Sequence, residues 1–451
     1  MKTNDFGSLF RQNRLLMFLA LTLFVVFSFS QTSAQPGGCN GNNWRLRFCR
    51  ERRDALLQKS ASEIENLDRQ IANDPKNAVN YYQRGRIYSA LIDLRLSGAR
   101  DVVFDDKVYF ADVEEKAIAD FTRAIQIAPR VEYHVERGKI YFSQWALETT
   151  DFQYRNRGDK HSDEEILQTI DKLFLYNEAF QAADKDFLKA IELSENYQTS
   201  RNARDQLYGL HNRRALSLNI SESIAGLIGG GKAADIALAD FDYAIEFYRL
   251  YLANNQREEH VKKYVYDAWI QKGAAAKRFG RDDIALEAFR QAEKEPVKII
   301  YPECALYQNR AEIFVKRMQF DAALKDVAFA IENNLNCKRM NELRGDIYLL
   351  KGDLTSAIDS YSVILNEKNG FDRDVYLKRG KVYLQISEAQ KAIDDFTAAI
   401  NYGGLCEKDY QLRAAAHRLA GDTQAAEADE ERARQARKHY TGSDYCHYHK
   451  N

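Results

Sequence analysis

Small and large apolar residues recur along this chain at the spacing of one side of a helix. One stretch reads Ala117-Ile-Ala-Asp-Phe121-Thr-Arg-Ala124-Ile125, and related stretches begin at Ala183, Ala237, Ala285, Ala323, Ala357, Ala392 and Ala426. Residues three and four apart share a side of a helix, so each stretch predicts a helix with one apolar stripe.

A second pattern stands upstream of these stretches. An aromatic or polar residue is followed three positions later by a basic residue and a small residue, and a bulky residue follows after three more. Examples are Tyr81, Arg84-Gly85 and Tyr88, or Tyr376, Arg379-Gly380 and Tyr383. This pattern also predicts a helix, in which the small residue lets a paired helix approach closely.

Together the two patterns resemble the tetratricopeptide repeat, a helix-turn-helix unit of 34 residues. Ala323, Ala357, Ala392 and Ala426 follow one another at 34, 35 and 34 residues. Eight copies cover about residues 77–437. The resemblance implies an all-α, right-handed superhelical solenoid of such repeats, with a concave surface lined mainly by the first helix of each pair.

The first three repeats are longer than the others, and their extra residues fall between the paired helices. Ser162 and Glu165 form a capping-box pattern, so the second helix of the second repeat is expected to begin near Ser162. The stretch 101–110 fits either a short strand pair or a helical turn. Residues 44–67 predict a helix that covers the first repeat. Glu430 replaces the phenylalanine of earlier copies, as expected for an end repeat.

The chain therefore divides into five segments. Residues 1–34 are expected to be a signal peptide, and 35–76 a capping-helix region. Residues 77–257 are repeats with long insertions, 258–437 are regular repeats, and 438–451 are a polar tail.

The N-terminal segment has the order of a secretory signal. Lys2, Arg11 and Arg14 precede an apolar run at 15–29, and cleavage is expected after Ala34. The alternative is an uncleaved anchor helix, although the run is short for a bilayer. We expect an exported protein, periplasmic or secreted, with no membrane span after cleavage.

Six cysteines in an exported chain are able to form disulfides. Proximity in the sequence suggests Cys39 with Cys49 and Cys406 with Cys446, which leaves Cys304 with Cys337. Cys304 and Cys337 lie at the starts of first helices in neighbouring repeats, so that pair requires a local bend. Free buried thiols are the alternative.

The stretch GLIGGGKA, residues 226–233, has the spacing of a phosphate-binding loop. No buried strand is expected before it, and Ala233 stands where a hydroxyl would hold magnesium. Three adjacent glycines end or break a helix, so we interpret this stretch as a linker that leads into the helix containing Ala237.

Other candidate chemistry is better explained by structure. His134 and His211 occupy the aromatic slot of a first helix, and His417 takes another packing slot. The tail places Cys446, His447 and His449 together, which could bind a metal, but pairing of Cys446 with Cys406 is favoured. The pairs Asp394-Asp395 and Asp282-Asp283 are interpreted as solvated faces and caps. We expect no catalytic residue, no metal and no cofactor. A formal net charge of -1 gives no bias toward nucleic acid.

The resemblance implies that a protein or peptide partner binds along the concave groove. Projecting the family pattern gives sixteen groove-facing residues, called here the predicted partner face: Tyr82, Arg86, Val135, Lys139, Asn212, Lys277, Gln308, Glu312, Lys316, Glu342, Asp346, Leu377, Lys381, Gln385, Gln411 and Arg418. The expected function is a non-catalytic scaffold or adaptor. The alternatives are an enzyme or metal-dependent protein that uses the early insertions or the Cys/His tail, and a structural part of an envelope complex.

Overall fold

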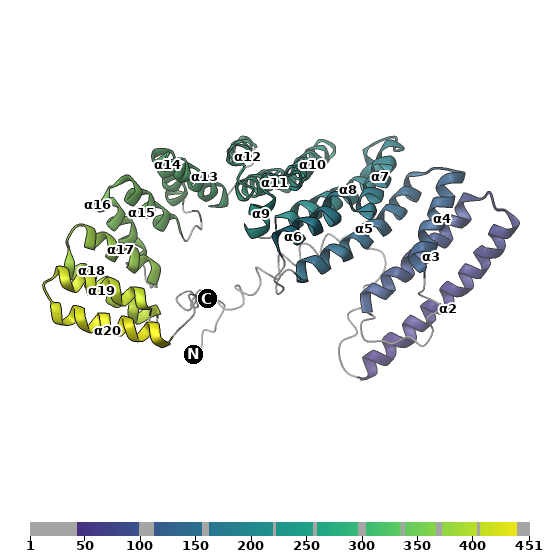
Figure 1. The fold of residues 1–451 in the computed structure, drawn as a ribbon. Helices are drawn as coiled ribbons and strands as arrows, with labels where there is room; N and C mark the ends of the chain where they lie inside the picture. Colours follow the sequence, from purple (N-terminus) through teal and green to yellow (C-terminus); the bar gives the residue numbers. More distant parts are fainter. Residues whose placement is uncertain are drawn as a thin grey trace, which may run out of the picture. The chain divides into compact units, whose positions relative to one another are not determined.

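The computed structural model describes residues 43–98, 112–155, 162–219, 222–255, 259–295, 304–333, 335, 339–366, 372–403 and 406–439. Within these ranges the regular structure is entirely helical (Figure 1). The chain divides into two compact units, Met1–Arg281 and Asp282–Asn451, called unit 1 and unit 2. This division falls later than the boundary at 257/258 that the repeat lengths suggest.

Unit 1 contains the long repeats. Its helices are α2 (Asn43–Asn73), α3 (Ala78–Gly98), α4 (Val113–Ile127), α5 (Val131–Arg155), α6 (Asp163–Ile170), the π-helical turn η1 (Asp171–Leu175), α7 (Glu178–Glu192), α8 (Tyr197–Leu218), α9 (Glu222–Ile228), α10 (Lys232–Asn254) and α11 (Glu259–Arg278). The pairs α3 with α4, α5 with α7 and α8 with α10 pack together, and each pair contacts the next.

Unit 2 contains α12 (Asp282–Lys294), α13 (Cys304–Lys316), α14 (Phe320–Glu332), α15 (Met340–Lys351), α16 (Leu354–Leu365), α17 (Arg373–Gln385), α18 (Ala389–Gly403), α19 (Glu407–Leu419) and α20 (Thr423–His439). Consecutive helices from α13 to α20 pack as neighbouring pairs. The expectation of an all-α solenoid of helical repeats is therefore confirmed.

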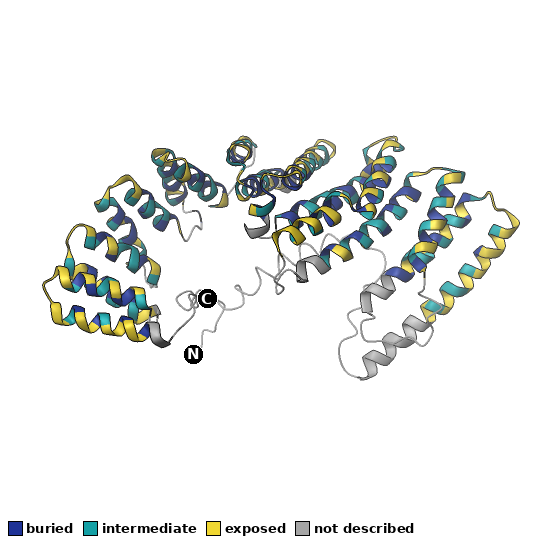
Figure 2. Cartoon of the chain, in the orientation of Figure 1, coloured by how far each residue is buried: buried dark blue, intermediate teal, exposed yellow. Residues whose placement is uncertain are grey.

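The predicted stripes form the core of each unit. Ala117, Phe121 and Ala124 have no exposed surface, and Ala392, Phe396 and Ala399 repeat this in unit 2. In Figure 2 the buried residues follow the faces on which neighbouring helices meet. Each helix can bury its apolar stripe only by packing against the neighbouring helices, so the core forms where the helices meet.

The small residue of the first helix lies directly under the large ring of the second. A Cβ atom built on Gly380 would stand 2.7 Å from Cε1 of Phe396, and one on Gly138 would stand 2.6 Å from Cε1 of Phe187. Real Cβ atoms do not approach other atoms so closely. The small residue is therefore required by the ring that covers it, as the sequence suggests.

The turn between paired helices in the regular repeats places one residue in the left-handed backbone region. Gly352 and Gly421 both have φ of 81°, but Met318 and Ser387 adopt 58° and 63° at the corresponding positions. Residues other than glycine are disfavoured in this backbone region by roughly 1–2 kcal/mol. The surrounding helix pair therefore imposes the turn even where the residue does not favour it.

The insertion of the second repeat is helical but broken. Ser162 caps α6 in a full capping box with Glu165, as predicted. The prediction of one second helix from Ser162 is wrong, because η1 ends the first segment and Asn177 caps a new helix, α7, through the amide of Phe180. Trp145 of α5 donates from its indole to the carbonyl of Leu173 at 2.7 Å and thereby satisfies a carbonyl of the π-helical turn.

The glycine-rich stretch is a linker between two helices. Helix α9 ends at Ile228 and α10 begins at Lys232, so no strand precedes it among the residues described here. The Lys232 side chain lies over the ring of Tyr176, 5.0 Å from its centroid. The interpretation of this stretch as a linker between two helices is confirmed.

Gly229 in this linker touches the end of the next first helix. A Cβ atom on Gly229 would stand 2.5 Å from the carbonyl oxygen of Phe279, whereas one on Gly230 would meet nothing within 4 Å. Arg281 holds the same junction, donating from Nε to the Gly229 carbonyl at 2.9 Å. The glycine at 229 thus allows two backbone segments to meet.

Replacing Gly229 with alanine is expected to destabilise unit 1 by about 1–3 kcal/mol, because a backbone carbonyl cannot move aside as a side chain can. Gly230→Ala is the matched control and should change the free energy of unfolding by less than about 1 kcal/mol. Urea unfolding followed by tryptophan fluorescence measures both, since all three tryptophans precede Arg281. Equal effects of the two substitutions would refute the close-contact explanation.

The N-terminal helix covers the first repeat as expected. Helix α2 packs on α3, with Leu57 and Ile64 against the cluster around Leu91. Arg84 of α3 also forms an ion pair with Asp68 of α2, so α2 takes the place before α3 that the second helix of a preceding repeat would take.

Several predictions lie outside the described residues. These are the signal peptide at 1–34, the 101–110 stretch and the tail beyond His439. Within the described part of the chain, no helix combines the length and apolarity needed to cross a bilayer.

Candidate functional site

A buried Arg–Asp pair joins the two helices of six repeats. The arginine before the small residue of the first helix donates from Nε and one terminal nitrogen to both carboxylate oxygens of the aspartate before the aromatic position of the second, at 2.6–2.9 Å. The aspartates are 1–5% exposed. The Arg–Asp pairs are Arg84–Asp120, Arg137–Asp186, Arg214–Asp240, Arg310–Asp326, Arg379–Asp395 and Arg413–Asp429.

This arrangement corrects one sequence interpretation. Asp395 is not part of a solvated face, because it is 4% exposed and holds Arg379. Its neighbour Asp394 is exposed, as expected. Asp282 and Asp283, in the first turn of α12, bind Lys316 and Arg317.

His134 and His211 extend these pairs and are framework residues, as predicted. His134 Nδ1 lies 2.8 Å from Oδ1 of Asp186, which also accepts from Arg137. Burial alone would favour the neutral acid, but the hydrogen bonds from Arg137 and His134 outweigh it and lower the pKa of Asp186.

His211 connects three helices. Its Nδ1 is 2.5 Å from Asp240 of α10, and its Nε2 is 2.8 Å from Asp184 of α7. Burial opposes a charge here, but the hydrogen bonds to Asp184 and Asp240 outweigh it and raise the pKa of His211. With a carboxylate at each nitrogen, the ring makes both contacts as donor only when protonated.

The predicted partner face contains three kinds of position. Six of its residues are exposed: Arg86, Lys316, Lys381, Gln385, Gln411 and Arg418. Eight are half-buried: Tyr82, Lys139, Asn212, Lys277, Gln308, Glu312, Asp346 and Leu377. Val135 and Glu342 are buried. Exposure therefore varies along the face from one repeat to the next.

The assignment of Val135 to the predicted partner face is wrong, because its side chain is 2% exposed and packs with Ala190 and Ala203. It belongs to the core between repeats and offers a partner no surface. Also in unit 1, the Tyr82 ring packs tilted against the Tyr133 ring with centroids 4.6 Å apart, and Lys139 forms an ion pair with Glu136 at 2.8 Å.

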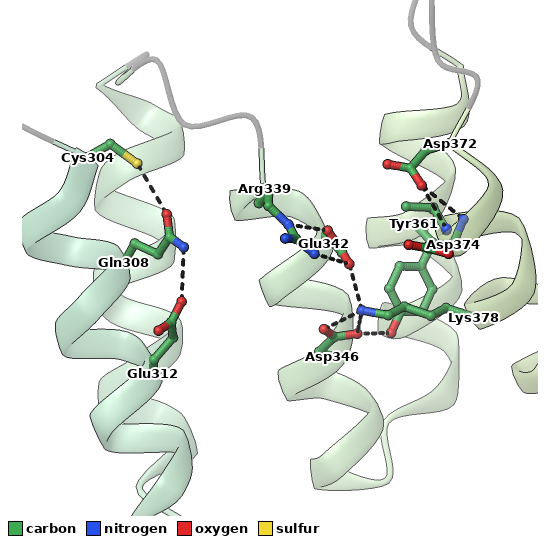
Figure 3. Close-up of polar contacts among 11 residues, drawn as sticks. Cys304, Gln308, Glu312, Arg339, Glu342, Asp346, Tyr361, Asp372, Asp374 and Lys378 are labelled. Carbon is green, nitrogen blue, oxygen red and sulfur yellow. Dashed lines mark hydrogen bonds and ion pairs between the residues drawn. The ribbon is translucent and has the colours of Figure 1, made fainter. Parts of the chain in front are cut away.

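Unit 2 brings polar and charged residues of three helices together (Figure 3). Lys378 of α17 lies 2.7 Å from Glu342 and 2.6 Å from Asp346, both on α15. Arg339 donates to Glu342 from Nε at 2.9 Å, and the Tyr361 hydroxyl of α16 donates to Asp346 at 2.7 Å. The two bases and two acids form a closed, neutral cluster.

The pKa directions follow from this geometry. Burial favours the neutral form of Glu342, but Arg339 and Lys378 outweigh it and lower its pKa. For Lys378, burial acts in the opposite direction to Asp346 and Glu342, and the acids raise its pKa. Glu342 and Asp346 are therefore held in place by residues of this chain, and Lys378 is a member that the sequence projection missed.

Next to this cluster, α13 carries a row of polar residues. Gln308 donates to Glu312 at 3.0 Å, and Cys304 contacts the Gln308 oxygen (Figure 3). Asp372 caps α17 by accepting from the amides of Asp374 and Val375. Each of these contacts lies within one helix or its own cap, so they stabilise α13 and α17 individually.

The end repeat is closed by a charge. Glu430 on α20 forms an ion pair with Arg418, a residue of the predicted partner face. A charged residue on the outer side of the last repeat fits the expectation of a polar end.

The alternative of a metal site gains no support from the described part of the chain. No group of three metal-ligating residues comes together in the described ranges. Cys304 and Cys406 are disulfide-bonded, so the alternative of free buried thiols is wrong for these two residues. Cys39, Cys337 and Cys446 lie outside the described ranges, and each predicted pair contains one of them, so the pairings remain a prediction. His447 and His449 also lie outside.

No family model and no curated protein matches the chain. Solved structures with similar folds include BtubC from P. vanneervenii, with 16% identity, 49% of this chain and 95% of that one covered, and a TM-score of 0.37. Yeast Tom70 has 13% identity, coverage of 86% and 77%, and a TM-score of 0.32. The P58(IPK) TPR domain is 14% identical, with 88% of this chain and 94% of that one covered, and has a TM-score of 0.24.

The helix pairs of this chain form a helical repeat solenoid of the kind that tetratricopeptide-repeat proteins have. The resemblance rests on the repeated sequence pattern and on the packing of small residues under large rings.

Proposed function

We propose that this chain is a protein-interaction scaffold, and that a protein or peptide segment binds to the predicted partner face. The observation that supports this is that the chain has two sets of polar residues, one buried and paired within the repeats and one exposed on the predicted partner face. The Arg–Asp pairs hold the helices together from inside, whereas Arg86, Lys381 and Gln385 are exposed and make no hydrogen bond within the described part of the chain. Such donors on rigid helices suit polar recognition of an extended partner.

We also propose that the scaffold is exported. The order of basic, apolar and small residues at 1–34 supports this. The scaffold function does not depend on the compartment.

Charge reversal on the predicted partner face tests the function. Affinity capture with the full chain would compare Lys381→Glu with Lys391→Glu, a control on the second helix of the same repeat. A corresponding pair in unit 1 is Arg86→Glu with Arg123→Glu. A partner that uses this face is recovered several-fold less with Lys381→Glu or Arg86→Glu than with its control.

Equal recovery of every partner from the face variants and their controls would reject the predicted partner face. Circular dichroism of each variant should match that of the parent, because all four positions are exposed.

A further inference from the structure

One repeat of unit 2 lacks the Arg–Asp pair. In the repeat formed by α15 and α16, Arg344 stands at the arginine position, but Ser360 replaces the aspartate. The Arg344 Nε donates to the Ser360 hydroxyl at 3.1 Å. That hydroxyl donates its own hydrogen to the carbonyl of Ser356 at 2.8 Å, so it faces Arg344 only as an acceptor.

The other supports of the arginine are also replaced in this repeat. In four other repeats a tyrosine three residues earlier lies 5.5–6.0 Å from the guanidinium carbon, and in two a histidine binds the aspartate. Here that position is Asn341, whose side-chain oxygen is buried with no hydrogen-bond partner.

The preceding second helix offers Arg344 no hydroxyl either. Arg137, Arg379 and Arg413 each donate to a threonine or serine at one position of that helix: Thr122, Ser362 and Thr397. The corresponding residue of α14 is Ala328. Arg344 is thus half-buried, and its hydrogen bond to Ser360 engages only Nε.

The missing group is a carboxylate. In six repeats two guanidinium nitrogens hold two carboxylate oxygens at one fixed place, and serine is shorter than aspartate by that group. A guanidinium offers a planar fork that matches a carboxylate, and a partly buried arginine without a counter-charge gains from acquiring one. Because Ser360 stands at the aspartate position, the guanidinium of Arg344 has the donors of a carboxylate site but no carboxylate to accept from them.

We propose that the terminal guanidinium nitrogens of Arg344 bind a carboxylate supplied from outside the chain. The ligand is either a small free carboxylate or the carboxylate of a bound polypeptide. The site lies between paired helices of one repeat and is separate from the neutral cluster of Lys378, Glu342 and Asp346. It does not depend on the proposed scaffold function.

Hydrogen exchange of the intact chain tests this proposal, with sodium acetate compared with sodium chloride at equal ionic strength and neutral pH. In the parent chain, acetate should slow exchange of the α15 and α16 amides several-fold relative to chloride. Ser360→Asp supplies the carboxylate internally, so exchange there should be slow in both salts and insensitive to acetate.

Asp395→Ser provides a positive control, because it creates the same arginine-serine arrangement at Arg379. Acetate should slow exchange in α17 and α18 of this variant. If acetate rescues Asp395→Ser but leaves α15 and α16 of the parent unchanged relative to chloride, the proposed site is wrong. An acetate effect at α15 and α16 that persists in Ser360→Asp would also overturn it.

Two blocked dipeptides separate the sources of the carboxylate, one with an aspartate side chain as its only acid and one with a free C-terminus. Protection of α15 and α16 by acetate alone assigns the site to a small molecule. Protection by a dipeptide as well assigns it to a polypeptide carboxylate and identifies which kind. Both results require loss of the effect in Ser360→Asp.

Discussion

Asp240→Asn should lower the free energy of unfolding of unit 1 by about 3–5 kcal/mol, the range for breaking a buried ion pair from one side. Asp240 is 2% exposed and accepts from both Arg214 and His211. The substitution retains the volume but removes the carboxylate that Arg214 and His211 share. Urea unfolding followed by tryptophan fluorescence measures the loss.

Asp242→Asn is the matched control for this experiment. Asp242 lies on the same helix and binds Lys272, but its side chain is 55% exposed. An exposed pair contributes about 0–1 kcal/mol. If the two asparagine variants lose similar stability, the Arg–Asp pair is not a main support of the fold.

The same contact makes the stability of unit 1 depend on pH. The folded-state pKa of His211 is raised, so its contribution is complete below the pKa of an unfolded histidine, near 6.5, and is lost as the pH rises through the raised value. Asp240→Asn should therefore reduce the loss of stability that occurs as the pH rises from the unfolded pKa of histidine to the raised folded-state pKa of His211.

Gly380→Ala should destabilise unit 2 by about 1–3 kcal/mol, because the new methyl group collides with the ring of Phe396. The measurement is hydrogen exchange of the α17 and α18 amides in the full chain, since the tryptophans report on unit 1. Exchange should become faster in these two helices than in α13 and α14.

Phe396→Leu tests the cause of this effect. With the ring removed, the added methyl group has room, so the cost of Gly380→Ala should be smaller in the Phe396→Leu background than in the parent chain. Contacting residues are expected to show such coupling. Additive effects of the two substitutions would show that the loss comes from elsewhere.

The sequence carries most of the fold because each repeat displays its own packing rule. Gly380 and Phe396 hold recognisable positions, and the ring covers the glycine as that pattern requires. The break between η1 and α7 was harder to predict, because the apolar stripe continues through Phe174 and hides the cap at Asn177.

The candidate site was less accessible to sequence reasoning. Arg379 and Asp395 are 16 residues apart, and so are the corresponding residues in two other regular repeats. This constant offset was a usable signal for the Arg–Asp pair. The contacts of Lys378 with Glu342 and Asp346 join different repeats, so they depend on how neighbouring first helices align, which no local pattern specifies.

The Arg–Asp pair also bears on how such an array changes in length. Each pair is completed inside one repeat, so duplicating or deleting a whole repeat adds or removes a balanced set of buried charges. A crossover within a repeat would instead separate an arginine from its aspartate and strand a charge in the interior. Gain and loss of entire two-helix units is therefore the route of evolutionary change that this interior tolerates best.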